Sequence, residues 1–224
     1  RKTRLVGSGF VLIMTSPAPY ILMVGVLIRL FIDVEFITAI VIGTVVSVIY
    51  VYWGGFRSVV QTDKLQFIFM FGGFIVLLGF LLKSGMSIEH LADRLRTTHL
   101  DPTGGMSVQN LIVWFLIASW TFIDPGFHQR CAAARSDIVA RKGILWSILF
   151  WFVFDMLSLT PGLYAAAYLS GIEPLLAYPL LAEQMLPVYL KGVFIVSLLA
   201  IVMSTVDSYA FLSALTFGRD IVGV

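Results

Sequence analysis

Long apolar runs separated by short polar segments dominate the sequence. Six runs reach or approach the roughly 20 apolar residues that a helix needs to cross a bilayer. They cover Leu5–Phe31, Phe36–Trp53, Ser58–Leu82, Val108–Ile123, Gly143–Leu169 and Val193–Leu215. The pattern predicts an all-α integral membrane protein with about six transmembrane helices.

The longest polar stretch, Lys83–Gly105, contains an amphipathic patch. Apolar Ile88, Leu91 and Leu95 alternate there with charged side chains. Such a pattern predicts a short helix that lies on the membrane surface.

Composition agrees with a membrane protein. Hydrophobic residues make up 59% of the 224 residues and charged residues 12%, against about 45–50% and about 25% in globular proteins. These values exclude a soluble, disordered or nucleic-acid-binding protein. The single cysteine, Cys131, excludes a disulfide framework and any CxxC site. Dispersed histidines (His90, His99 and His128) and the absence of HExxH, GxSxG and P-loop patterns indicate that the chain is not an enzyme.

The distribution of Lys and Arg predicts the orientation in the membrane. A cytoplasmic N-terminus places ten of the 15 basic residues inside, and the cluster Arg130–Lys142 contributes most. We therefore expect a multi-pass protein of the plasma or inner membrane with both ends of the chain cytoplasmic. The start at Arg1 and the end at Val224, without terminal signals, predict a piece of a longer protein.

Helix breakers interrupt three of the runs. Pro17 and Pro19 lie in the first, Asp124–Pro125–Gly126 ends the fourth, and Pro161–Gly162 lies in the fifth. Broken helices at membrane depth must line a cavity or pack inside protein, and in transporters they build substrate and ion sites. A single proline can equally be a packing kink, but Asp-Pro-Gly favours a functional break.

Four acids lie in or at the ends of the apolar runs: Asp63, Asp124, Asp155 and Asp207. A charge at the bilayer centre costs about 2.5–3.5 kcal/mol on insertion scales, so each acid needs a partner or a function.

The sixth run carries the densest polar face. Ser204, Asp207 and Ser208 stand at i, i+3 and i+4, with Thr205 beside them. Hard cations such as Na⁺ take oxygen ligands of these kinds. The alternative is that the hydroxyls only bond back to carbonyls of the preceding turn, but Asp207 favours an ion site.

Three stretches make the chain resemble the sodium:solute symporters. They are GGFRSVVQTDKLQ (residues 54–66), DPGFHQRCAAARS (residues 124–136) and AIVMSTVDSYAFLSALTFGRDI (residues 200–221). The resemblance implies the inverted-repeat fold of the leucine transporter, of which this chain holds core helices three to eight. Residues 1–84 would then end the first repeat, 85–106 would form an outer loop, and 107–224 would begin the second repeat.

The resemblance also implies the ion ligands. Ser204 and Thr205 match hydroxyl ligands of the conserved sodium site, and Ile201 matches a backbone carbonyl ligand. Asp63 matches an acid near the cytoplasmic sodium route. In some members a second sodium position lies there, and Asp63, Asp207 and Ser208 match its residues.

For the substrate, Trp120 matches an aromatic inner gate and Asp124 a polar position used by sugar carriers. The lysine of sugar carriers has no counterpart, since Trp151 stands near its position.

The function so implied is symport of Na⁺ with a small polar organic solute. One alternative is a proton-coupled carrier of the same fold that uses Asp63, Asp155 or His128. Another class is a membrane sensor module; a channel lacks support because neither a filter-like loop nor charged rings are visible.

Overall fold

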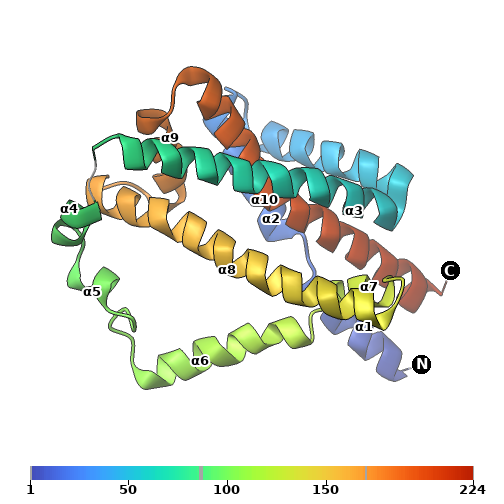
Figure 1. Cartoon of the computed structure of the whole chain (residues 1–224). Coiled ribbons are helices and arrows are strands. Elements are labelled where there is room, and N and C mark those ends of the chain that lie inside the picture. Colours follow the sequence, from blue (N-terminus) through green and yellow to red (C-terminus); the bar gives the residue numbers. More distant parts are fainter. Residues whose placement is uncertain (1, 86–87, 170, 224) are drawn as a thin grey trace. The chain divides into compact units, whose positions relative to one another are not determined.

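The computed structural model describes residues 2–85, 88–169 and 171–223, without the side chains of residues 88–90. These residues form helices joined by short turns, and no strand occurs among them (Figure 1). The elements are α1 (Lys2–Met14), α2 (Ala18–Phe31), α3 (Phe36–Lys83), α4 (Ile88–Arg94), α5 (Thr97–Leu100), α6 (Val108–Ala118), η1 (Ser119–Phe122), α7 (Pro125–Ala132), α8 (Asp137–Tyr168), η2 (Pro174–Leu176), α9 (Ala177–Met185), α10 (Val188–Leu215) and η3 (Thr216–Val222).

Five helical segments of the described chain are long and apolar enough to span a membrane, which makes this a multi-pass membrane protein. They are Lys2–Phe31, Phe36–Lys83, Val108–Ala132, Asp137–Tyr168 and Val188–Val222. The count differs from the expected six because α3 joins the second and third runs. Its 48 residues would extend about 72 Å if straight, far beyond the roughly 30 Å hydrocarbon core.

Gly55 divides α3 into two helical halves. Its backbone angles, φ 55° and ψ −147°, are not helical and lie where only glycine is comfortable. The helix before Gly55 and the helix after it therefore correspond to the two runs predicted from the sequence.

The chain forms two compact units, residues 1–70 with 195–224 and residues 71–194. Both boundaries lie inside long helices, α3 and α10. The division by inverted repeats, 1–84 and 107–224, concerns symmetry rather than contacts and stays a prediction.

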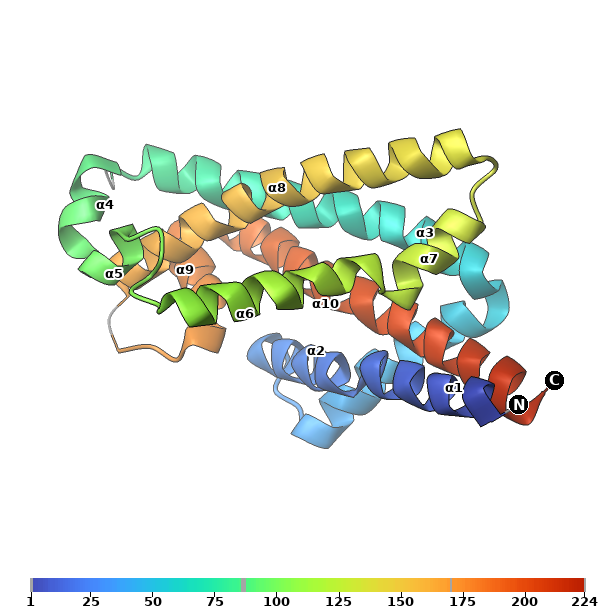
Figure 2. The ribbon, with the colours of Figure 1, turned by 90° about the horizontal axis from the view of Figure 1, so that it is seen from below.

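In the first unit, α10 forms hydrogen bonds with the residue that follows α1, at the break between α1 and α2. Helix α1 ends at Met14, and Pro17 directly precedes the start of α2 at Ala18. Thr15, which is completely buried, lies 3.1 Å from Ser213 through their hydroxyl oxygens, and Ser213 also donates to the Thr15 carbonyl at 2.9 Å. The end of the chain, η3, packs beside α1 (Figure 2).

Two glycines let α2 and α3 approach closely. A Cβ atom on Gly25 would lie 2.5 Å from Ile40 Cγ1, and one on Gly43 would lie 2.2 Å from Val24 Cγ1. Small residues at a helix crossing are typical of membrane helices, where close van der Waals packing replaces the hydrophobic effect.

In the second unit, aromatic rings form the core. Phe74 lies 5.4 Å from Phe154, 5.3 Å from Tyr178 and 5.2 Å from Phe194, measured between ring centroids. The Tyr178 hydroxyl donates to the Ser158 carbonyl at 3.1 Å, and burial raises its pKa, so it remains a donor. These contacts fasten α9 against α8.

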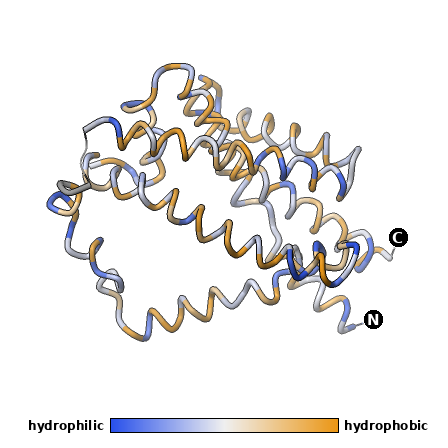
Figure 3. Tube along the Cα trace, viewed as in Figure 1, coloured by the Kyte–Doolittle hydropathy of each residue, from blue (hydrophilic) through white to orange (hydrophobic). Residues whose placement is uncertain are grey.

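Hydropathy changes sharply along this unit (Figure 3). Helix α8 is mostly apolar, and large side chains such as Trp146 and Phe152 are exposed along it. The junction between α7 and α8, which carries Arg135, and the first turns of α8, which carry Arg141 and Lys142, are hydrophilic. An exposed apolar helix that ends in basic residues is typical of a membrane span.

Helix α4 begins at Ile88, within the stretch predicted to be an amphipathic helix. Leu91 is buried, and Arg94 lies over the Tyr168 ring at 4.8 Å from its centroid. Ile88, Glu89 and His90 have side chains outside the described part, so the location at the membrane surface stays a prediction.

Candidate functional site

Asp207, on α10, is completely buried. The hydroxyl of Ser47 donates to its Oδ1, and the hydroxyl of Tyr50 donates to its Oδ2. Gln66 donates to the same Oδ2 from its amide nitrogen at 3.1 Å. Three donors thus compensate a carboxylate whose burial would otherwise be expensive.

These donors come from both halves of α3. Ser47 and Tyr50 stand at i and i+3 on the half before Gly55, and Gln66 lies on the half after it. One carboxylate therefore joins α10 to two helices of the same unit.

The predicted ligands of the conserved sodium site lie two to six residues before Asp207 on α10: Ile201, Ser204 and Thr205. The Ser204 hydroxyl donates to the Ile201 carbonyl oxygen at 2.9 Å, which is the back-bond of the alternative interpretation. The contact also brings two oxygens together on one turn, beside half-buried Thr205. A sodium ion is compatible with this set of neutral hard oxygens.

The other predicted ion residues, Asp63 and Ser208, lie in the same unit and are half-buried. Asp63 is on α3 one turn before Gln66. No cluster of three or more His, Cys, Asp or Glu side chains occurs within the described ranges.

Two further buried oxygens lie on α3, at Thr44 and Gln66. Thr44 Oγ1 and Gln66 Oε1 accept no hydrogen bond from any described residue. Thr44 stands one turn before Ser47 on α3. A buried oxygen without a partner costs about 1–3 kcal/mol, and water or a cation would satisfy it.

The predicted break at Asp124 is present in the second unit. Helix α6 passes into η1 and ends, and α7 begins at Pro125. Asp124 Oδ1 accepts hydrogen bonds from the amides of Gly126 at 2.8 Å and Phe127 at 3.2 Å. Trp120 donates from Nε1 to Asp124 Oδ2 at 3.3 Å, so the predicted pair is in contact.

Asp124 is therefore the N-cap of α7, a position that aspartate favours. Its burial, with 7% of its surface exposed, fits either a cap or a residue that also meets a substrate. His128, on α7, also joins the two sides of the break, because its Nε2 donates to the carbonyl oxygen of Phe122 in η1 at 2.9 Å.

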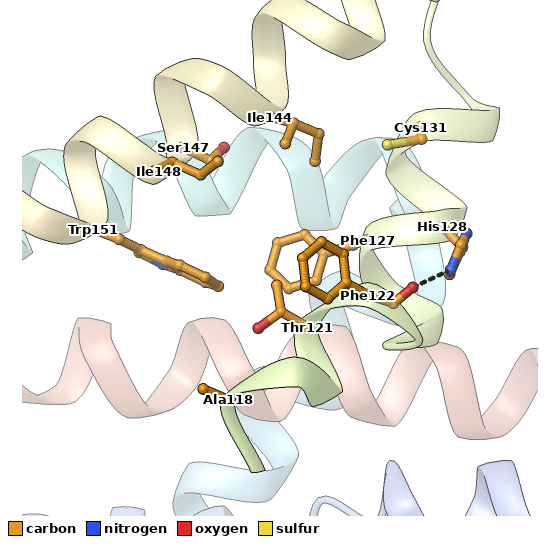
Figure 4. A pocket seen from close by; sticks show the side chains of 10 residues that line it. All are labelled: Ala118, Thr121, Phe122, Phe127, His128, Cys131, Ile144, Ser147, Ile148 and Trp151. Atoms are coloured by element: carbon orange, nitrogen blue, oxygen red, sulfur yellow. Dashed lines mark hydrogen bonds between the residues drawn. The ribbon is translucent and has the colours of Figure 1, made fainter. Parts of the chain in front are cut away.

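A cavity of about 420 Å³ adjoins this break (Figure 4). Phe127 and Trp151 meet edge to face at its wall, with ring centroids 5.3 Å apart. Trp120 and Asp124 are not among its lining residues, which are Ala118, Thr121, Phe122, Phe127, His128, Cys131, Ile144, Ser147, Ile148 and Trp151. Cys131 and His128 thus face a cavity that the sequence did not predict.

The partners of Asp207 were also missed. Thr44, Ser47 and Tyr50 form a stripe of hydroxyls at intervals of three in an apolar run, which was the available signal. Gln66 belongs to one of the three motif stretches, but the sequence assigned it no role. Asp155 is exposed on α8, and its carbonyl accepts from Ser158 at 3.2 Å.

Comparison with known proteins gives a consistent result. The model of the sodium:solute symporter family matches residues 6–222. The sodium/pantothenate symporter of Haemophilus influenzae is 27% identical over 77% of this chain and 37% of its own length. The sodium/glucose cotransporter of Vibrio parahaemolyticus is 27% identical over 78% of this chain and 38% of its own length.

The chain thus spans less than two fifths of the length of either relative. No solved structure matches it significantly.

Proposed function

Because the chain belongs to the sodium:solute symporter family, we propose that it forms the central part of a carrier that couples Na⁺ entry to solute uptake. The match to the family model over nearly the whole chain is the observation that carries this proposal. The solute is a small polar organic molecule. The carrier lies in the cell membrane, with both ends of this chain in the cytoplasm.

The coupling ion binds at the turn formed by Ile201, Ser204 and Thr205. The Ser204 hydroxyl points its hydrogen at the Ile201 carbonyl, 2.9 Å away. When Na⁺ binds, this hydrogen turns aside, and the hydroxyl and carbonyl oxygens both face the ion. Asp63 supplies a negative charge on the sodium route.

The solute binds at the break between α6 and α7. A broken helix leaves backbone carbonyls and amides without helical partners. Asp124 satisfies two of the amides and orients the Trp120 ring through the contact with its Nε1. Trp120 covers the cytoplasmic side of the bound solute, and Asp124 uses its remaining lone pairs to orient a solute hydroxyl or amine.

Sodium is favoured over a proton as the coupling ion. Both relatives carry the word sodium in their names. Asp155, an acid that a proton-coupled carrier could use, is exposed on α8, and His128 is engaged with the Phe122 carbonyl.

The test uses the longer protein that we expect to contain this chain, reconstituted into vesicles. A panel of amino acids, sugars and organic acids is presented under an inward Na⁺ gradient, with choline replacing Na⁺, and under a proton gradient alone. We expect uptake of at least one solute to require Na⁺. Uptake that persists in choline and follows the proton gradient would contradict the proposal.

A further inference from the structure

The hydrogen bonds around Asp207 affect how the turn formed by Ile201, Ser204 and Thr205, here called the sodium turn, is held in place. The carboxylate is completely buried, and a carboxylate offers about four lone-pair positions. Ser47, Tyr50 and Gln66 occupy three of them. Both oxygens are engaged, so little acceptor capacity remains for a cation.

The three donors are spread over two helices that Gly55 folds apart. Ser47 holds Oδ1 of the carboxyl group, whereas Tyr50 and Gln66, which lie on either side of Gly55, both hold Oδ2. Hydrogen bonds to a charged group are stronger than neutral ones, and none of the Asp207 surface is exposed. Asp207 is therefore fixed in position and in rotation about the α10 axis.

The sodium turn lies on the same helix, immediately before this fixed point. Ser204 precedes Asp207 by three residues and Thr205 by two. A helix is rigid over one turn, so the angle at which Asp207 is held sets the direction in which the hydroxyls of Ser204 and Thr205 point.

We propose that Ser47, Tyr50 and Gln66 are positioning residues that set sodium affinity, and that Asp207 anchors α10 to α3 instead of ligating the ion. The inference rests on the proposed sodium coupling. It differs from the role that the family resemblance implies for Asp207, because the carboxylate oxygens are already occupied by protein donors. The buried negative charge still favours a nearby cation, without direct contact.

A double-mutant cycle on Na⁺-dependent uptake tests the proposal. Tyr50→Phe removes one hydroxyl and keeps the ring, and Asp207→Asn removes the charge and keeps the shape. Each variant should raise the half-saturating Na⁺ concentration about three- to tenfold, since each disturbs a charge-assisted hydrogen bond. The double variant should be no worse than the more affected single variant, because both changes break the same contact.

Further measurements distinguish positioning from a general loss of structure. At saturating Na⁺, the solute KM should stay unchanged in Tyr50→Phe, whereas a merely destabilised protein would lose maximal rate without a shift in Na⁺ dependence. Tyr20→Phe is the matched control, since Tyr20 packs against Tyr209 outside this cluster. Gln66→Met repeats the cycle with a second donor if Tyr50→Phe reaches the membrane poorly.

Additive effects of Tyr50→Phe and Asp207→Asn would overturn the proposal. So would an unchanged Na⁺ dependence in Tyr50→Phe and Gln66→Met when Asp207→Asn alone is impaired, because Asp207 would then act as a ligand by itself. Uptake by the unmodified protein that ignores Na⁺ would instead remove the proposed function, and with it the basis of this inference.

Discussion

Asp63 lies half-buried on α3, one turn from a residue that bonds Asp207. If its charge attracts sodium on the cytoplasmic route, Asp63→Asn should raise the half-saturating Na⁺ concentration. Asp63→Glu should retain part of the affinity, since it keeps the charge with a longer side chain. Uptake measured over a range of Na⁺ concentrations checks both. Normal ion dependence in Asp63→Asn would make Asp63 a structural residue.

Trp120 and Asp124 are tested through the solute instead of the ion. Trp120→Ala removes the ring that donates a hydrogen bond to Asp124. Asp124→Asn removes the carboxylate charge and keeps an oxygen that can cap α7, since Asn and Asp cap helices about equally well. Each should raise the solute KM severalfold and leave half-saturation by Na⁺ nearly unchanged. Loss of surface expression in both, or an unchanged solute KM, would mean that the break is architectural.

For single residues, the sequence identified the candidate functional side chains better than their hydrogen-bond partners. Asp207 and Asp124 stood out because a carboxyl group in an apolar run needs an explanation. Ser47, Tyr50 and Gln66 did not, because a hydroxyl or amide in a membrane helix is unremarkable until the fold brings it to a carboxylate 141 to 160 positions away. Long-range pairing of this kind leaves no local pattern.

The crossing of α2 and α3 depends on the absence of side chains at two glycines. In Gly43→Ala the new methyl group would meet Val24 Cγ1 at 2.2 Å, and valine in a helix has essentially one rotamer to offer. We expect a loss of about 1–3 kcal/mol in stability, seen as a lower melting temperature of the detergent-solubilised protein.

Gly72→Ala is the control for this variant. It lies on the same helix, where a Cβ atom would meet nothing within 4 Å. Equal melting temperatures for Gly43→Ala and the unmodified protein would show that α2 can move away from α3 at no cost.

Several helix ends and breaks could be predicted because their causes are local, although α8 continues through Pro161 and Gly162, where an interruption was also expected. Proline at 17 and 125 and the positive φ at Gly55 each act through the backbone of their own segment. The two halves of α3 match two predicted runs, and the non-helical backbone of Gly55 lies between them. The cavity beside α7 was also missed, because it arises from packing between separate helices.

For the whole molecule, the distribution of basic residues predicts which segments face the cytoplasm. Asp137, at the start of α8, and Thr98, in α5, are both exposed and are expected on opposite sides. In a cysteine-free background, a membrane-impermeant thiol reagent added to intact cells should label Thr98→Cys and spare Asp137→Cys. Labelling of Asp137→Cys alone would show that the orientation is the opposite of the predicted one. Labelling of both variants in permeabilised cells is the control that each cysteine is accessible to the reagent.

The central claim is that the turn containing Ile201, Ser204 and Thr205 holds the coupling sodium. The most direct measurement is the half-saturating Na⁺ concentration for uptake by the double variant Ser204→Ala, Thr205→Ala. Ser158→Ala is the matched control, because its hydroxyl also bonds back three residues, to the Asp155 carbonyl. The double variant should require at least tenfold more Na⁺ at similar expression, and the control should not. Unaltered Na⁺ dependence in the double variant would contradict the assignment.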